Sequence, residues 1–219
     1  FTDDSKDYLQ GIFDTILNKD IARRLNIADT VSLENVTKFL LHSIGNKISP
    51  TKIANTLKSA GKSVDQKTVD KYIKGLVDSM LIYEAGRYNI KGKQFLSTQS
   101  KYYVVDVGMR NALVKSSESD IGHILENIVY LELKRRYKNV YVGEIDSGEV
   151  DFVSVNDNKY EYYQVSATTL DENTLKRELA PFGKIKDNYP KYLLTLDDVF
   201  SNADYNGVQK INVLEWLLK

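Results

Sequence analysis

The sequence contains no cysteine, which excludes disulfide bonds, thiolate metal ligands and cysteine nucleophiles. Only 3 prolines and 2 histidines occur among its 219 residues. No segment approaches the roughly 18 consecutive apolar residues that a membrane-spanning helix needs, and no signal-peptide pattern opens the chain. The chain begins at Phe1 in helix-like sequence, so we expect a fragment of a longer protein. These absences predict a protein of the reducing cytoplasm without a membrane partner.

The formal net charge is zero, but basic and acidic residues are unevenly distributed. Residues 1–106 carry 16 Lys and Arg against 12 Asp and Glu, whereas residues 107–219 carry 14 against 18. The basic excess lies between residues 46 and 101, with 11 basic residues against 4 acidic ones. Such an excess is the electrostatic footprint of a nucleic-acid contact, although a solvated lysine-rich face is the commoner cause. Charge therefore favours a nucleic-acid partner for the first half only.

The first hundred residues show helical periodicity followed by a hairpin pattern. Helices are predicted over 5–27, from about residue 32 to a stop at Gly45, and from Ser49 with proline in the first turn. The helix over 65–80 has the clearest amphipathic pattern. A hairpin is predicted over 81–90, with its turn at Ala85-Gly86. Three helices and a basic hairpin are typical of a winged helix-turn-helix.

A lysine face lies opposite the apolar stripe of the helix predicted over 65–80. In a winged helix this face enters the DNA major groove, while basic residues of the wing contact phosphate. The alternative is that these side chains are merely solvated and that the domain binds a protein. The predicted DNA contacts are Lys67, Lys71, Lys74, Arg87, Lys91 and Lys93.

Residues 101–219 have the mixed strand and helix pattern of an α/β domain with a central mixed sheet. A helix over 122–136 is apolar on nearly every side, so it should be buried, and it carries Glu126. A buried carboxylate requires a partner, such as a metal ion or a basic side chain. A second helix is predicted over 171–187, and strands are predicted near 102–106, 139–143, 150–155, 160–166 and 191–196.

Two of these strands carry polar residues in the pattern of a metal-dependent nuclease. Glu149 and Asp151 share one face of the first strand, and Gln164 and Ser166 share one face of the second. In such a site carboxylate oxygens hold Mg²⁺, while a lysine stabilises the attacked phosphate or water. Because Ser166 stands at the lysine position, the skeleton of a nuclease is predicted without its full chemistry.

Six segments form an ordered series: 101–111 (KYYVVDVGMRN), 122–127 (GHILEN), 149–153 (EVDFV), 163–166 (YQVS), 177–179 (REL) and 185–191 (IKDNYPK). This series resembles the C-terminal half of a family of prokaryotic AAA-type ATPases. In that family a P-loop ATPase domain is followed by a winged helix and an uncharacterised domain related to restriction-endonuclease-like nucleases. The resemblance implies that residues 1–28 end the ATPase domain, 29–100 form the winged helix-turn-helix, and 101–219 form the restriction-endonuclease-like α/β domain.

The resemblance also implies that Glu126, Asp151 and Gln164 occupy catalytic positions. Gln164 brings no charge, so we expect a degenerate, inactive nuclease-like site in a chain that binds nucleic acid or a protein partner. One alternative is an active Mg²⁺-dependent nuclease with metal ligands Glu126, Glu149 and Asp151. Another is a protein-docking platform without a DNA role. ATP and its Mg²⁺ would belong to the absent ATPase domain, so we expect no cofactor in this chain unless the nuclease-like site holds Mg²⁺.

Overall fold

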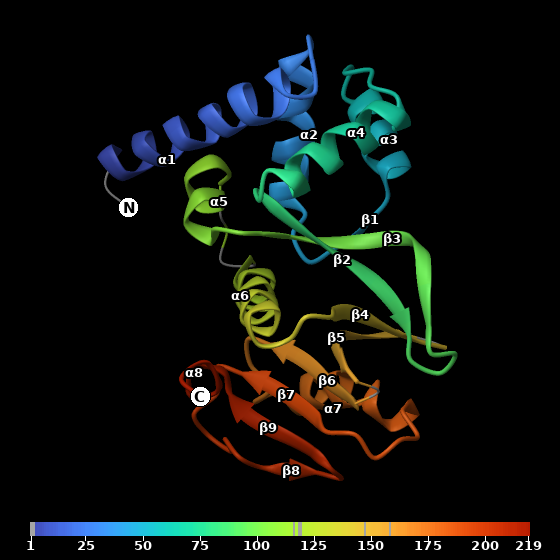
Figure 1. The fold of residues 1–219 in the computed structure, drawn as a ribbon. Helices are drawn as coiled ribbons and strands as arrows, with labels where there is room; N and C mark the ends of the chain where they lie inside the picture. Colours follow the sequence, from blue (N-terminus) through green and yellow to red (C-terminus); the bar gives the residue numbers. More distant parts are fainter. Residues whose placement is uncertain (1–2, 116, 118–119, 147, 158) are drawn as a thin grey trace. The chain divides into compact units, whose positions relative to one another are not determined.

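The computed structural model describes residues 3–115, 117, 120–146, 148–157 and 159–219, except for the side chains of Asp3 and Thr98. The chain combines helices with a mixed β-sheet, so the predicted α/β class is confirmed (Figure 1). It forms two compact units. The first unit consists of Phe1–Glu84 and Gln99–Glu118, and the second of Ala85–Thr98 and Ser119–Lys219.

These units do not follow the predicted domain bounds after residues 28 and 100. The N-terminal helical segment belongs to the first unit, because Phe13, Leu17 and Ile21 are buried in its apolar core. The chain passes between the units within two strands, β2 (Ile82–Asn89) and β3 (Gln94–Val104). Long-range packing therefore decides where the units divide, and local composition does not reveal it.

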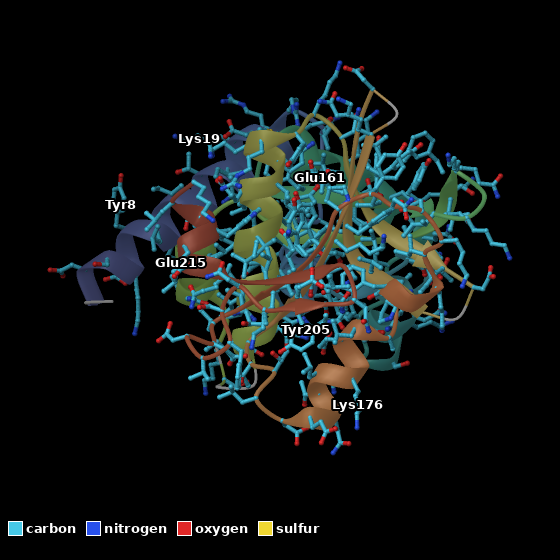
Figure 2. All side chains as sticks on the ribbon, turned by 90° about the horizontal axis from the view of Figure 1, so that it is seen from below. Tyr8, Lys19, Glu161, Lys176, Tyr205 and Glu215 are labelled. Carbon is cyan, nitrogen blue, oxygen red and sulfur yellow. The ribbon has the colours of Figure 1, made fainter. Side chains whose placement is uncertain are left out.

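The first unit is mainly helical. Asp29, Ser49 and Asp65 each cap a helix by accepting a hydrogen bond from the backbone N–H three residues later. The helix predicted over 5–27 is an α-helix followed by a π-helical segment, and it leaves Tyr8 70% exposed (Figure 2). The elements are α1 (Asp3–Thr15), η1 (Ile16–Arg23), α2 (Thr30–His42), α3 (Pro50–Ser59), α4 (Gln66–Asp78) and α5 (Val107–Leu113).

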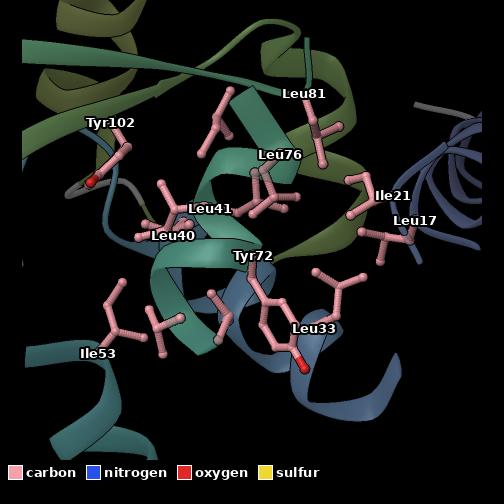
Figure 3. Close-up of a cluster of buried hydrophobic side chains, with 14 of the residues drawn as sticks. Leu17, Ile21, Leu33, Leu40, Leu41, Ile53, Tyr72, Leu76, Leu81 and Tyr102 are labelled. Atoms are coloured by element: carbon pink, nitrogen blue, oxygen red, sulfur yellow. The ribbon is translucent and has the colours of Figure 1, made fainter. Parts of the chain in front are cut away.

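The apolar face of α4 is buried, as its periodicity predicted (Figure 3). Val69, Tyr72 and Leu76 lie in one core with side chains of α2 and α3. Burying an aliphatic side chain of this size contributes about 1.5–3 kcal/mol. Met80, which the pattern included, follows the end of the helix at a φ of 55° and is exposed. The buried face fixes the rotation of α4 and so leaves its lysines in solvent.

The predicted turn at Ala85-Gly86 is wrong. β2 continues through both residues, and Ala85 is fully buried within it. The turn comes later, where Asn89 Oδ1 accepts a hydrogen bond from the Gly92 N–H at 2.6 Å. The Asn89 side chain closes the turn by a hydrogen bond, and this determines the position of the turn more strongly than the small residues Ala85 and Gly86 do. The second strand is therefore β3, which also pairs antiparallel with the short strand β1 (Lys47–Ile48).

A mixed β-sheet forms the centre of the second unit, as predicted. Its strands follow the order β2-β4-β5-β6-β7-β9-β8. β4, β5 and β6 are antiparallel neighbours, whereas β6, β7 and β9 are parallel. The strands are β4 (Val140–Ile145), β5 (Gly148–Asn156), β6 (Lys159–Ser166), β7 (Lys191–Thr195), β8 (Asp204–Tyr205) and β9 (Val208–Asn212).

The α-helices that the structure describes in this unit pack on the sheet. α6 (Ile121–Arg136) contacts β4, β5 and β6, α7 (Glu172–Leu179) contacts β6, and α8 (Val213–Leu217) contacts β7 and β9. The helix predicted over 171–187 ends early, because Pro181 follows α7 and a 3₁₀ turn, η3 (Phe182–Lys184), replaces it. Sequence periodicity does not predict the short elements α5, β8 and α8, because each contains too few residues to show a repeating pattern. No helix in the described residues is long and apolar enough to cross a lipid bilayer.

Candidate functional site

An open cleft of about 640 Å³ lies in the second unit, bounded by the start of α6, the strands β5 and β6, and α7. It brings together the three predicted catalytic residues, with Glu126 from α6, Asp151 from β5 and Gln164 from β6. Ser166 also lines it. Glu149 is not among the described residues that line the cleft. The three predicted catalytic residues therefore lie in one cleft. Of the predicted metal ligands, Glu126 and Asp151 lie there and Glu149 does not.

Asp151 and Gln164 are joined directly across two strands. The β5–β6 register pairs Phe152 with Tyr163, which brings their neighbours Asp151 and Gln164 side by side. The Asp151 N–H donates to Gln164 Oε1 at 3.2 Å, and the Val165 N–H donates to Asp151 Oδ2 at 3.0 Å. Both side chains are nine-tenths buried. Much of their hydrogen-bonding capacity is therefore used by the fold itself.

Glu178 on α7 completes a chain of hydrogen bonds that the sequence analysis missed. Its Oε2 accepts from Gln164 Nε2 at 2.8 Å, and its Oε1 accepts from Arg177 Nε and Nη2 at 3.1 and 2.8 Å. The Glu178 side chain is 11% exposed, whereas that of Arg177 is 73% exposed. The segment 177–179 contributes to the family resemblance only as a motif, and nothing in its spacing shows that its carboxylate faces Gln164.

His123 lies beside Glu126 on the first turn of α6. Its Nδ1 is 4.0 Å from Glu126 Oε2, and the imidazole is 44% exposed while the carboxylate side chain is 11% exposed. The i, i+3 spacing accounts for the proximity.

The oxygen ligands of the cleft do not fit the Mg²⁺ site that the nuclease resemblance implies. Gln164 Oε1 faces the Asp151 N–H, and both oxygens of Glu178 accept hydrogen bonds from side chains. In the part of the chain that the structure describes, no three His, Asp or Glu side chains are grouped so that they could hold a metal ion. Mg²⁺ needs several oxygens directed at one point.

Among the described residues, no lysine of another element takes the place of the one expected at position 166. Lys176 pairs with Glu172 at 2.6 Å and points outward from α7 (Figure 2). Lys210 of β9 is buried, but its ammonium donates to Asp197 Oδ2 at 2.9 Å. Of the described residues that line the cleft, none is a lysine. Arg177 is the only Lys or Arg side chain among them.

Asp197 anchors the loop that follows β6. Burial alone would raise the pKa of Asp197, but hydrogen bonds from Thr168, Lys210 and Thr169 outweigh it and hold this pKa below its usual range. Ser166 Oγ in turn donates to the Thr168 carbonyl at 2.9 Å. Lys210 therefore stabilises the loop at the edge of the cleft through Asp197. It is not among the described residues that line the cleft.

The lysine face of α4 (Lys67, Lys71 and Lys74) is exposed, opposite the buried stripe. None of the three ammonium groups has a hydrogen bond or an ion pair with the described residues. Asp65 caps the helix, and hydrogen bonds from Thr68 lower the pKa of this carboxyl. This part of the predicted DNA contact is free to meet a ligand.

The predicted wing residues belong to the other unit. Arg87 lies in β2 where this strand pairs in parallel with β4, and its Nη2 is 2.7 Å from Glu144 Oε2. Lys91 pairs with Asp146 at 2.8 Å, and the Lys93 ammonium lies over the ring of Tyr160. The structure therefore divides the six predicted DNA contacts into two sets of three, one in each unit.

Comparisons with known proteins give a family but no function. Residues 1–120 match the family described as "Domain of unknown function (DUF8612)", and the chain belongs to this family. An uncharacterized protein of Haemophilus influenzae is 39% identical over 211 residues, which are 96% of this chain and 52% of that protein. Uncharacterized protein MJ1544 of Methanocaldococcus jannaschii is 34% identical over 216 residues, 95% of this chain and 45% of that protein.

The chain spans about half the length of these curated relatives. A crystal structure of protein VC1899 from Vibrio cholerae aligns with 92% of this chain and 53% of its own, at 12% identity and a TM-score of 0.28. A score this low does not establish a shared fold. Neither the relatives' descriptions nor this structure assigns an activity.

Proposed function

We propose that this chain is the DNA-binding C-terminal part of a cytoplasmic AAA-type ATPase. Its first unit carries the helices of a winged helix, which contact the phosphates of duplex DNA, and its second unit is a nuclease-like domain that has lost its chemistry. The observation that carries the proposal is the lysine face of α4, because its three cations are exposed and have no partner within the described residues.

The order of elements along the first hundred residues supports a winged helix. α2, β1, α3 and α4 are followed by β2 and β3, and β1 pairs with β3. In a helix-turn-helix the second helix presents its exposed side to the groove, and α4 holds that place after α3. Thr51 Oγ1 donates to Gln66 Oε1 at 2.9 Å and joins the first turns of α3 and α4.

The energetics of exposed lysines also favour a phosphate ligand. An exposed ammonium group loses little hydration free energy when it contacts a phosphate. The release of condensed counterions from the DNA then drives the association. Three such contacts correspond to a slope of about −2.7 in a plot of log K against log salt. By helical spacing Asp70 and Asp78 lie on the same exposed side of α4 as the three lysines, and they reduce its local positive potential.

Two positions of the cleft in the second unit support the proposal that this domain is not catalytic. A neutral amide, Gln164, occupies the second strand position, and its carboxamide is held at both ends by Asp151 and Glu178. Ser166 supplies no cation for a developing negative charge. The ATPase assignment rests on the resemblance of the six ordered segments and on the length of the relatives, of which this chain covers about half.

The test is a titration of the chain with a labelled duplex of about 20 base pairs. The variant K67E/K71E/K74E should bind on the order of 100-fold more weakly, and its unfolding free energy should change by less than about 0.5 kcal/mol per site. The control K19E/K138E/K159E changes the same number of charges at exposed positions elsewhere.

The control should keep near wild-type affinity and the wild-type salt slope. If the α4 variant binds as the wild type does, or if the control loses as much affinity, the lysine face is not the DNA-binding surface. Binding that does not depend on salt would contradict the phosphate contact as well.

A further inference from the structure

A second pocket of the second unit has an apolar floor and a basic rim. It measures about 580 Å³ and shares no lining residue with the acidic cleft. A volume of this size is typical of sites for small ligands or single ligand groups. Its lining residues are Ile90, Lys91, Lys93, Ile145, Asp146, Gly183, Lys184, Ile185, Lys186 and Asp187.

Three isoleucines from distant parts of the sequence form the floor. Ile90 follows β2, Ile145 ends β4 and Ile185 follows η3, and each is more than nine-tenths buried. The Ile90 N–H donates to the Glu144 carbonyl at 3.0 Å, which holds the ends of β2 and β4 together. All three isoleucines line the pocket and give it an apolar floor.

Two short segments carry the lysines of the rim. The turn after β2 is closed by the hydrogen bond from the Gly92 N–H to Asn89, and Lys93 adopts a φ of 48° in it. In the other segment Lys184 and Lys186 flank the buried Ile185, whose N–H donates to the Phe182 carbonyl at 3.0 Å. Both backbone segments are therefore fixed by the fold before any ligand arrives.

The carboxylates of the rim are occupied by other groups. Asp146 pairs with Lys91 at 2.8 Å. Asp187 Oδ2 accepts a hydrogen bond from the Tyr162 hydroxyl at 2.6 Å, and Asp187 Oδ1 lies 3.7 Å from the ammonium of Lys191. These pairings leave the other rim lysines as an excess of positive charge around an apolar floor.

Lys93 and Lys186 are the clearest part of this excess. The Lys93 ammonium lies 5.5 Å from the centre of the Tyr160 ring, an interaction that orients the cation and keeps its charge. Lys186 has no hydrogen bond or ion pair with the described residues and is exposed. Two cations on opposite segments of one rim match a ligand that is anionic and has an apolar part.

We propose that this pocket binds an unpaired nucleotide of a single-stranded nucleic acid, with backbone phosphates on the lysines and a base against the isoleucine floor. Lysine is a common phosphate contact, and bases stack on apolar side chains. A paired base within a duplex cannot reach such a floor. The choice of nucleic acid over other anions rests on the proposed function.

The experiment uses the full chain and a labelled oligothymidylate of about 12 nucleotides. The variant K93E/K186E should bind this strand at least about 10-fold more weakly, whereas the control K138E/K159E should bind it as the wild type does. An abasic strand of equal length keeps the phosphates but lacks the bases. The wild type should bind the abasic strand about 10-fold more weakly, because stacking is lost.

The two proposals fail in different measurements. K186E, which leaves the predicted wing residue Lys93 in place, should weaken binding of the oligothymidylate and retain duplex binding. K67E/K71E/K74E should retain binding of the oligothymidylate. If K93E/K186E binds the strand as tightly as the wild type, the pocket is not the site. If polyglutamate competes as well as the oligonucleotide, or if the abasic strand binds equally well, charge alone accounts for binding and the nucleotide site is rejected.

Discussion

The lysine face of α4 and the acidic cleft of the second unit use charge in opposite ways. On α4 three cations are exposed and have no partner among the described residues. In the cleft Asp151, Gln164 and Glu178 are nine-tenths buried and hydrogen-bonded to one another or to nearby backbone. Burial explains the difference, since a charge removed from water must be satisfied when the chain folds.

This contrast separates positions that hold the fold from positions that can bind a ligand. A substitution among the internally bonded groups of the second unit should change stability. A substitution on α4 should change binding and leave stability nearly unaltered. Trp216 is the only tryptophan, and it is buried in the second unit, so its fluorescence reports the unfolding of that unit.

The largest effect is expected from Lys210→Met, which breaks the buried pair with Asp197. The Lys210 and Asp197 side chains are 2% and 3% exposed, so the remaining carboxylate would stay buried without its cation. We expect a loss of about 3–5 kcal/mol in unfolding free energy. Urea unfolding followed by Trp216 fluorescence measures it.

Lys159→Met is the matched control, because Lys159 is exposed at the start of β6. It should change the unfolding free energy by less than about 0.5 kcal/mol. A loss below about 1 kcal/mol for Lys210→Met would show that the pair is not needed, and the contrast between buried and exposed charge would be weaker than stated.

Asp151→Asn tests whether the cleft is a relic or an active nuclease. The Asp151 carboxylate accepts a hydrogen bond from the Val165 N–H, and asparagine keeps the shape but removes the charge. We expect a loss of about 1–2 kcal/mol in stability. DNA cleavage with Mg²⁺ or Mn²⁺ should stay at background for the wild type and the variant alike.

The exposed Asp7 of α1 provides the matched substitution, Asp7→Asn, which should leave stability unchanged. Metal-dependent cleavage by the wild type that disappears in Asp151→Asn, while the variant stays folded, would establish the nuclease. In that case the hydrogen bonds within the cleft would have to rearrange around the metal.

Local patterns were enough to predict the parts of the molecule that depend on one helix or one strand. The buried and exposed faces of α4 follow from its periodicity. The convergence of Glu126, Asp151 and Gln164 was expected from the resemblance and from strand alternation, and all three line one cleft. The two faces of α4 need no knowledge of distant neighbours. The convergence of the three cleft residues, which lie on three different elements, was expected from the family resemblance.

The features that escaped prediction depend on distant neighbours. Glu178 binds Gln164, and Lys210 pairs with Asp197, although no spacing links either pair in the sequence. The hairpin was placed too early because Ala85-Gly86 has the composition of a turn, while the burial of Ala85 in β2 is a tertiary effect. The parallel pairing of β2 with β4, which engages Arg87, could not be read from either strand alone.

A smaller effect on stability is expected from the ion network around Glu132. This network is less buried than the Lys210–Asp197 pair and less exposed than the lysines of α4. Glu132 on α6 accepts hydrogen bonds from Arg135 at 2.7 and 2.6 Å and from Arg136 at 2.6 Å. The Glu132 side chain is 13% exposed, and the Arg136 guanidinium also lies over the ring of Trp216. The bonds from Arg135 and Arg136 outweigh burial and lower the pKa of Glu132 to about 2, from an ordinary value of 4.5.

Glu132→Gln should therefore cost about 1 kcal/mol at pH 7 and progressively less in acid. Because the folded pKa lies below the unfolded one, the stabilisation is complete above about pH 4.5 and is lost as the pH falls toward 2. Urea unfolding of both proteins between pH 7 and about pH 3 should show the difference shrinking. The exposed Glu215 gives the control Glu215→Gln, with a small difference at every pH. A difference for Glu132→Gln that is independent of pH would mean that packing, and not the charge of Glu132, holds this network together.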